Sequence, residues 1–226
     1  MRKQNVLLKP NSREAETAVA KNIEAEDFIK VSGSKPYLFF KRMFDIVVSF
    51  VLGVLLLVPM LIIAVWIKLD SDGPVLFRQE RLGKGGKPFT IYKFRSMRTD
   101  AEKDGPRWAE VDDERVTRAG RILRRTRFDE LPQIWNVFVG NMSIVGPRPE
   151  REFFYLLFEQ DIPGFRNRLI VKPGLTGLAQ VNGGYELDPA SKLKFDMEYI
   201  KHRSAWLDIM CILKTVKVVF THEGAR

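Results

Sequence analysis

The sequence predicts a mostly helical α+β protein with a hydrophobic anchor near its N-terminus. Three observations lead to this prediction: a 22-residue segment without charge, two strand-like stretches around a glycine-rich turn, and later segments with helical spacing of apolar residues. A chain of 226 residues is long enough for one domain with its own core beside such an anchor. The net charge of +9 indicates an anionic partner, which could be nucleic acid, an anionic lipid surface or a phosphorylated substrate.

The chain divides into three expected parts. Residues 1–34 are polar and of mixed charge, and we expect them to form a mobile arm. The hydrophobic anchor lies within residues 35–69, and residues 70–226 carry the remaining motifs. The single cysteine, Cys211, has no partner for an internal disulfide and lies in an apolar stretch, so we expect a buried, inert thiol.

The anchor is built on the segment 46–67, which reads IVVSFVLGVLLLVPMLIIAVWI and is long enough for a membrane helix. Pro59 lies past its middle and removes a backbone hydrogen bond, which predicts a kink there. Lysine and arginine flank both ends, so the positive-inside rule gives no preferred direction of crossing. Two topologies therefore stay open: a kinked helix that spans the bilayer, and a re-entrant hairpin that bends at Pro59 and returns to the same face.

Strand and helix patterns follow the anchor. GPVLFRQERL and KPFTIYKFRSM flank GKGGK, and their β-branched and aromatic residues predict a small β-hairpin with a glycine turn. Leu131, Ile134, Trp135 and Phe138 have the spacing of one buried helical face, and Asp129 marks the start of that helix. REFFYLLFEQ and SAWLDIMCILKTVKVVF predict amphipathic helices, which either lie at a membrane surface or belong to the core.

Asp129 and Glu130 form an acidic pair inside a strongly basic stretch. Helix capping alone can explain two carboxylates at a helix N-terminus, because free backbone N–H groups and the helix dipole favour them. The surroundings suggest more, since several arginines lie on either side: Arg118, Arg121, Arg124, Arg125, Arg127 and, within GPRPE, Arg148. Guanidinium groups keep a carboxylate ionised and attract phosphate oxygens. In such a site one carboxylate can attack phosphorus while its neighbour binds a divalent metal.

A competing metal site is offered by Asp70 and Asp72 in DSDG, because DxD pairs bind Mg²⁺ or Mn²⁺ in many nucleotide-sugar glycosyltransferases. The glycine and proline that follow also fit a plain turn at the end of the anchor. His202 and His222 show no metal-ligand spacing and no nucleophile partner. The sequence has no RNP aromatics and no zinc finger, so we expect no nucleic-acid partner.

Several motifs, taken in order, resemble the bacterial sugar transferase family: KRMFDIVVS, GPVLFRQERLGKGGKPFTIYKFRSM, VTRAGRILRRTRFDELPQIWNVFVGNMSIVGPRPE, VKPGLTGLAQVNG and FDMEYI. The family consists of monotopic polyprenyl-phosphate phosphoglycosyl transferases, which initiate exopolysaccharide, capsule or glycoprotein glycan assembly. The resemblance covers residues 41–220. It implies a re-entrant anchor bent at Pro59, in the bacterial inner membrane, with the catalytic domain on the cytoplasmic face.

The resemblance also implies the chemistry and its residues. An Mg²⁺-dependent enzyme would move a sugar 1-phosphate from a UDP-sugar to undecaprenyl phosphate and release UMP in a two-step, ping-pong reaction. Asp129 would be the nucleophile that carries the phosphosugar, and Glu130, together with Asp129, would bind the metal. Arg124 and Arg148 would lie near the diphosphate, and the neighbouring Arg118 is a further candidate. Asp196 matches an acidic position of the family to which we assign no definite role.

Two departures from the family pattern are visible. Val58 replaces the serine that many members have before the hairpin proline, and Gly184 replaces the arginine of a common NGR sequence. Neither the sugar nor the glycan pathway can be read from a motif, and a homodimer is compatible with the sequence. Two rival functions stay open: a DxD glycosyltransferase that releases UDP, and a basic membrane-anchored binding protein in which Asp129→Asn has no effect.

Overall fold

The computed structural model describes residues 31–103, 105, 113–184 and 187–221. The predicted mobile arm lies outside these residues except for 31–34. Those four residues contact the domain, because the Ser32 N–H donates to the Ile200 carbonyl at 3.1 Å and Val31 packs against a core cluster.

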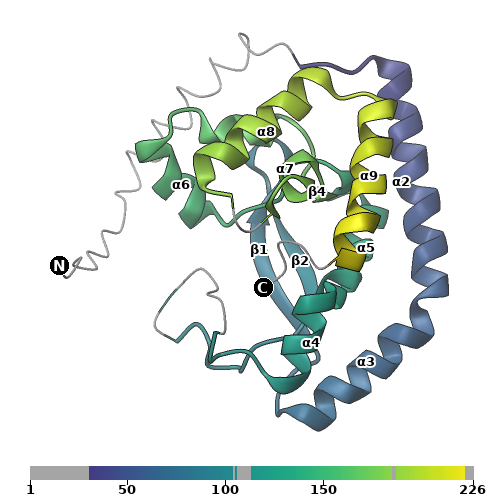
Figure 1. The fold of residues 1–226 in the computed structure, drawn as a ribbon, viewed down its shortest axis with the longest axis vertical. Coiled ribbons are helices and arrows are strands. Elements are labelled where there is room, and N and C mark those ends of the chain that lie inside the picture. Colours follow the sequence, from purple (N-terminus) through teal and green to yellow (C-terminus); the bar gives the residue numbers. More distant parts are fainter. Residues whose placement is uncertain (1–30, 104, 106–112, 185–186, 222–226) are drawn as a thin grey trace.

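The described residues are mostly helical, as the sequence predicts (Figure 1). The helices are α2 Lys35–Leu55, α3 Leu57–Asp70, η2 Lys84–Gly86, α4 Arg118–Thr126, η3 Phe128–Gln133, α5 Ile134–Val139, α6 Glu152–Asp161, η4 Phe165–Ile170, α7 Leu178–Val181, α8 Pro189–His202 and α9 Ala205–Thr221. The strands are β1 Leu76–Leu82, β2 Pro88–Phe94, β3 Ser143–Val145 and β4 Gly174–Thr176.

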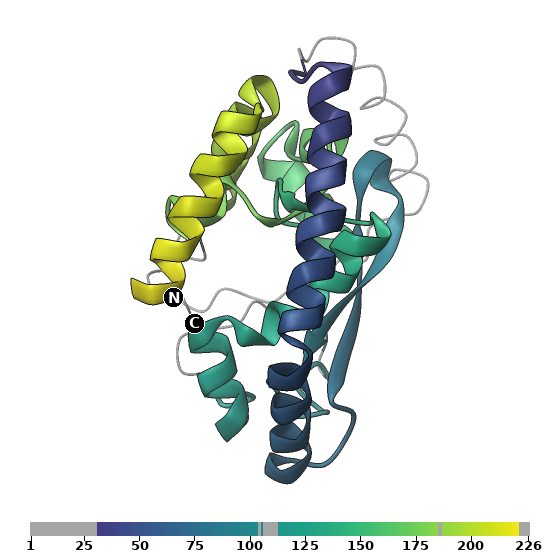
Figure 2. The same cartoon turned by 90° about the vertical axis from the view of Figure 1, so that its right-hand side faces the viewer.

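The anchor forms two helices, α2 and α3, which meet at Leu56 and are bent by 59°. Pro59 explains the break, because it has no N–H and its ring crowds the Leu55 carbonyl four residues earlier. In the described part of the chain no single helix is long and apolar enough to cross a bilayer, although the bent pair passes that test jointly. Figure 2 shows the pair running along the full height of one side of the molecule.

The predicted β-hairpin is confirmed. Strands β1 and β2 pair antiparallel, with Leu76 opposite Phe94 and Leu82 opposite Pro88. The connection contains Gly85 and Gly86 at φ 67° and 72°, a left-handed conformation that glycine adopts without strain. A second, short sheet pairs β3 and β4 in parallel and directs the GPRPE segment that follows β3.

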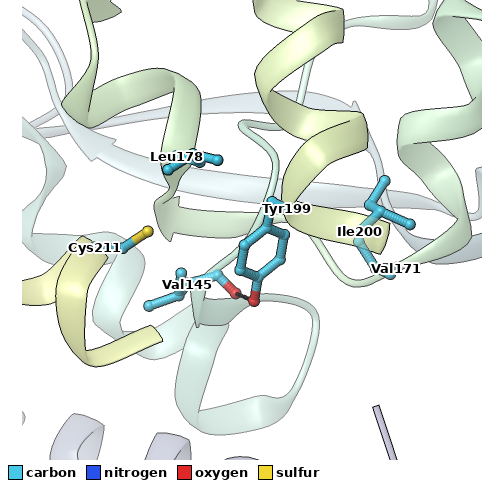
Figure 3. Close-up of a cluster of buried hydrophobic side chains, with 6 residues drawn as sticks. All are labelled: Val145, Val171, Leu178, Tyr199, Ile200 and Cys211. Carbon is cyan, nitrogen blue, oxygen red and sulfur yellow. Dashed lines mark hydrogen bonds between the residues drawn. The ribbon is translucent and has the colours of Figure 1, made fainter. Parts of the chain in front are cut away.

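The main hydrophobic core joins β3, the end of η4, α7, α8 and α9 (Figure 3). Tyr199 of α8 lies at its centre, and its hydroxyl donates to the Val145 carbonyl at 3.1 Å. Cys211 of α9 is part of the same cluster, and burial raises the pKa of its thiol to about 11. The expectation of a buried thiol is therefore confirmed.

Polar side chains fix helix α2 to the domain. The Asp45 carboxylate is buried and accepts hydrogen bonds from the Ile144 N–H at 2.9 Å and the Ser143 hydroxyl at 3.2 Å. Arg42 donates to two backbone carbonyls at the end of α5, at 2.7 Å each. Lys41 forms a 2.8 Å ion pair with Asp208 of α9. The first half of the anchor is thus amphipathic and packed on the domain.

The opposite faces of these helices expose a broad apolar surface. On α2 and α3 it consists of Phe39, Phe40, Phe44, Val47, Phe50, Val51, Val54, Leu55, Leu57, Val58, Leu61, Ile62, Val65 and Leu69. On α9 the exposed side chains are Trp206, Ile209, Leu213 and Val216, which follow helical spacing along one face. Large exposed apolar areas of this kind mark contact with lipid or protein.

One helix prediction needs correction, and the two amphipathic helices, for which a core and a surface position were both open, differ from each other. Ile134 is buried as expected, but Trp135 is 57% exposed and packs beside Phe138. The reason is Asn136, whose amide bonds the backbone of β2 at Thr90 and Tyr92 and thereby turns the polar side of α5 inward. Helix α6 is a core helix, because Phe154 and Tyr155 are buried, whereas α9 keeps an exposed apolar face.

Candidate active site

The acidic pair lies in a short 3₁₀ helix held between α4 and the hairpin. Helix α4 starts at Thr117, whose hydroxyl accepts from the Gly120 N–H at 3.0 Å, and ends at Arg127. Arg127 has φ 60° and ψ 16°, the one non-glycine residue with positive φ in the described part of the chain. This left-handed turn reverses the chain and places Asp129 and Glu130 in the first turn of η3, against β2.

Glu130 is ion-paired with two cations from other parts of the chain. Arg148, from the loop after β3, donates to both carboxylate oxygens, with 3.1 Å between Nη1 and Oε2. Lys93 of β2 donates to Oε1 at 3.1 Å. Although burial opposes ionisation, these two charges hold the pKa of Glu130 well below its usual range. Glu130 is therefore a fixed anion at the junction of three segments.

Asp129 is in a different electrostatic state from its neighbour. Burial, reinforced by the adjacent Glu130 charge, raises the pKa of Asp129 to about 6, even though Lys93, Arg124 and Arg148 oppose the shift. The carboxylate is mostly ionised at neutral pH but poorly solvated. A carboxylate of this kind is more nucleophilic than one that is fully hydrated or ion-paired.

Both carboxylates open into a cavity of about 990 Å³. Its lining includes twelve lysine or arginine residues and four aspartate or glutamate residues, so the cavity is strongly positive. Arg124, Arg127 and Arg148 line it together with the acidic pair. Such a surface attracts phosphate groups, and each arginine can donate to two phosphate oxygens at once.

A buried ion pair supports Arg148 from behind. The Arg168 Nε donates to Asp196 Oδ2 at 2.7 Å, and its Nη2 donates to the backbone carbonyl of Arg148 at 3.0 Å. The Arg168 guanidinium also lies over the Phe165 ring, 4.7 Å from its centroid. Asp196 is fully buried and does not line the cavity, so it orients Arg148 through Arg168.

The structure brings together most of the predicted site residues. Arg124 and Arg148 line the cavity beside Asp129 and Glu130. Arg118 does not line the cavity. It is exposed, in the first turn of α4. Pro59 lies in the anchor helix α3 and has no part in this cavity.

The competing DSDG pair has structural contacts instead. The Asp70 carboxylate accepts from the Ala119 N–H at 3.2 Å and so caps helix α4. Arg95 donates to the backbone carbonyls of Ser71 and Asp72 at 2.6 and 2.7 Å, which fixes the turn. Neither aspartate lines the cavity.

Sequence reasoning missed Lys93, Arg127, Arg168 and Gln180, all of which line the cavity. Lys93 and Gln180 lie inside motifs quoted for the family resemblance, and this was the available signal for both. Arg127 was included only as one of a run of arginines. Arg168 gave no local signal, because its role depends on contacts with residues far away in the sequence.

Asp129 and Glu130 are the side chains of this site that could hold a divalent cation. Mg²⁺ usually binds one or two protein carboxylates together with substrate phosphates and water. In the segments that the structure describes, no group of three or more His, Cys, Asp and Glu side chains could hold a metal without such help. Asp129 and Glu130, next to a phosphate-attracting cavity, match this pattern.

Comparison with known proteins assigns the family. The profile of the bacterial sugar transferases matches residues 36–222. The chain therefore belongs to the bacterial sugar transferase family. The matched region includes the elements that form the cavity, from the hairpin through η3 to the loop after β3.

Three relatives illustrate the similarity. The UDP-N-acetylgalactosamine-undecaprenyl-phosphate N-acetylgalactosaminephosphotransferase of Aeromonas hydrophila is 47% identical over 84% of this chain and 46% of its own length. The UDP-glucose:undecaprenyl-phosphate glucose-1-phosphate transferase of Caulobacter vibrioides is 43% identical over 82% of this chain and 71% of its own. The undecaprenyl-phosphate galactose phosphotransferase of Salmonella typhimurium is 38% identical over 83% of this chain and 42% of its own. The chain thus spans about half the length of several relatives that it matches.

Removing Asp196 should strongly destabilise the protein, because it leaves the Arg168 charge buried without a partner. For Asp196→Ala we expect a loss of about 3–5 kcal/mol, which lowers the melting temperature by on the order of 10 °C in a thermal unfolding experiment. Asp100→Ala is the matched control, since Asp100 pairs with Arg98 at 3.5 Å on the exposed surface and should change the melting temperature little. Adding Arg168→Met to Asp196→Ala should recover part of the loss. Equal melting temperatures for Asp196→Ala and the control would contradict the assignment.

Proposed function

We propose that this protein transfers a sugar 1-phosphate from a UDP-sugar to undecaprenyl phosphate and releases UMP. The observation that carries the proposal is the poorly solvated Asp129 beside the ion-paired Glu130, within a cavity lined by phosphate-binding arginines. Family membership supports it, since the relatives named above are undecaprenyl-phosphate sugar phosphotransferases. The relatives name different sugars, so the sugar transferred by this chain stays open.

The reaction has two displacements at one phosphorus. In the first, an Asp129 carboxylate oxygen attacks the phosphorus that bears the sugar, a new O–P bond forms, and the bond to the bridging oxygen breaks. The electron pair leaves with UMP, and the sugar phosphate stays on Asp129. In the second, an oxygen of undecaprenyl phosphate attacks the same phosphorus and displaces the Asp129 carboxylate. The product is the sugar diphosphate of the lipid.

Neighbouring residues have distinct tasks in this scheme. Arg124 and Arg127 bind oxygens of the diphosphate and neutralise charge that develops on the leaving UMP. Arg148 and Lys93 hold Glu130 in place, so that the acidic pair keeps its geometry. Mg²⁺, bound by Glu130 and Asp129, would add positive charge to the phosphates and favour the ionised form of Asp129.

The exposed apolar surface supports a membrane location. Both the outer faces of α2 and α3 and the Trp206 face of α9 present large apolar side chains, and the lipid acceptor itself is membrane-bound. The two helices are bent by 59°. If they entered the membrane as a symmetric V, α3 would reach about 10 Å below the membrane surface, which is less than the thickness of one leaflet. We therefore propose a re-entrant anchor, with the catalytic domain on the cytoplasmic face of the inner membrane.

The two rival functions have less support. A DxD glycosyltransferase needs Asp70 and Asp72 at the substrate site, but they cap α4 and form a turn outside the cavity. A plain binding protein has no need of a carboxylate with a raised pKa inside a cationic cavity.

Asp129→Asn should abolish UMP release, because an amide is not a nucleophile toward phosphorus. We expect a decrease of about 10³-fold or more, measured with membrane-extracted protein, undecaprenyl phosphate, Mg²⁺ and a panel of UDP-sugars. Asp72→Asn is the control and should retain activity. UDP release, or UMP release that survives in Asp129→Asn, would refute the proposed route.

Metal removal should stop the reaction without unfolding the protein. Excess EDTA is expected to abolish UMP release, and added Mg²⁺ to restore it, because the diphosphate charge is then again neutralised. The melting temperature should stay the same, since Glu130 is already paired with Lys93 and Arg148. Full activity in EDTA would exclude the metal from the reaction.

Single cysteines should reveal the topology of the anchor. Leu38→Cys and Asp72→Cys, each in a Cys211→Ser background, should react with a membrane-impermeant maleimide from the same side of the membrane. Gln160→Cys on the exposed surface of α6 reports the side of the catalytic domain. Labelling of Leu38→Cys and Asp72→Cys from opposite sides would establish a spanning helix and overturn the re-entrant anchor.

A further inference from the structure

Part of the cavity wall carries buried polar atoms that have no hydrogen-bond partner among the residues that the structure describes. Gln180 is 8% exposed, and neither its Nε2 nor its Oε1 has a partner in these segments. Arg168 is 2% exposed, and its Nη1 likewise has no partner in the described part of the chain, although its Nε and Nη2 are bonded. Both residues line the cavity that contains Asp129. Buried polar groups in proteins almost always have partners, and a molecule bound in the cavity would supply them for these three atoms.

The backbone holds Gln180 close to the segment 146–148, which carries Arg148. Helix α7 begins directly after Gly177, where an added Cβ would lie 2.1 Å from the Gly146 carbonyl oxygen and 2.8 Å from the Gln180 Oε1. The Gln180 amide therefore lies over Gly177, beside the chain that leads from Gly146 to Arg148.

Gln180 and the Arg168–Asp196 pair bring no net charge to this part of the cavity wall. The Arg168 charge is compensated by Asp196 at 2.7 Å, and Gln180 is neutral. Arg124 and Arg127, by contrast, are cationic and line the same cavity as Asp129, where they attract phosphate. A neutral group with hydrogen-bond donors and acceptors suits Gln180 and Arg168 better than a phosphate does.

We propose that Gln180 and Arg168 bind the pyrimidine of the nucleotide-sugar donor, an inference that rests on the function proposed above. Their unpartnered atoms are two donors and one acceptor: Gln180 Nε2, Arg168 Nη1 and Gln180 Oε1. The imide edge of uracil presents the complement, with the O2 and O4 acceptors on either side of the N3–H donor. Glycine at position 184, which also lines the cavity, adds no side chain that would fill this space.

The test measures binding of UDP and of pyrophosphate to the full-length protein by titration calorimetry in Mg²⁺ buffer. Gln180→Met keeps the length of the side chain and removes both hydrogen-bonding atoms. We expect it to weaken UDP binding about tenfold or more and to leave pyrophosphate binding unchanged. Gln180→Glu should also weaken UDP binding, because a carboxylate cannot donate to a uracil oxygen. Unchanged pyrophosphate binding by Gln180→Met shows that this variant is folded.

Gln133→Met is the matched control. Gln133 is also buried and has an unpartnered amide nitrogen, but it lies outside the cavity lining, so UDP affinity should not change. Wild-type UDP affinity in Gln180→Met would overturn the subsite and leave water as the partner of the amide. Unchanged UDP affinity with impaired turnover of the UDP-sugar would assign the amide to the sugar and overturn the pyrimidine assignment. A wild-type protein that binds UDP but releases no UMP from any UDP-sugar would refute the proposed function while retaining the subsite.

Discussion

The ion pairs of Glu130 are the contacts on which the arrangement of the site depends. Lys93 reaches it from the hairpin and Arg148 from the loop after β3, while Glu130 itself belongs to η3. Three segments that share no sheet are joined at one carboxylate. Because all three groups are largely withdrawn from water, loss of any one would leave the others without compensation, and this makes the junction cooperative.

The charge compensation extends inward from this junction. Arg148 is oriented by Arg168, which is in turn paired with Asp196 beneath the cavity. Each of these buried charges has an opposite charge beside it. Asp129 is the contrast, since its pKa is raised and its neighbours stabilise Glu130 more than they stabilise Asp129. The same group of charges thus lowers the pKa of one carboxylate while the pKa of the next one stays raised, as the proposed nucleophilic role of Asp129 requires.

Sequence reasoning succeeded where the signal is local. The β-branched and aromatic residues around GKGGK predicted the hairpin, and Pro59 predicted the break in the anchor. The arginines around Asp129 and Glu130 indicated cationic surroundings, and Arg124, Arg127 and Arg148 line the cavity with this pair. It failed where a position is set by a distant partner. The ion pairs of Glu130 and Asp196 join residues 37, 18 and 28 positions apart, and no periodic pattern encodes them.

Two local errors have similar causes. Arg118 and Arg124 read alike in the run of arginines, but they lie at opposite ends of α4, and only the second reaches the cavity. Trp135 matched the spacing of a buried face, yet the rotation of α5 is set by hydrogen bonds from Asn136 to β2. The spacing of apolar residues shows which side chains share one face of a helix, whereas a single buried amide can decide which face points inward.

The attachment of α2 through Asp45, Arg42 and Lys41 has a mechanical consequence. The helix that would enter the lipid is joined to β3, α5 and α9 at several places, and it cannot swivel independently of them. The anchor helix and the domain then move as one rigid unit. If the anchor is embedded in lipid as proposed, the depth of the anchor would fix the height of Asp129 above the membrane surface.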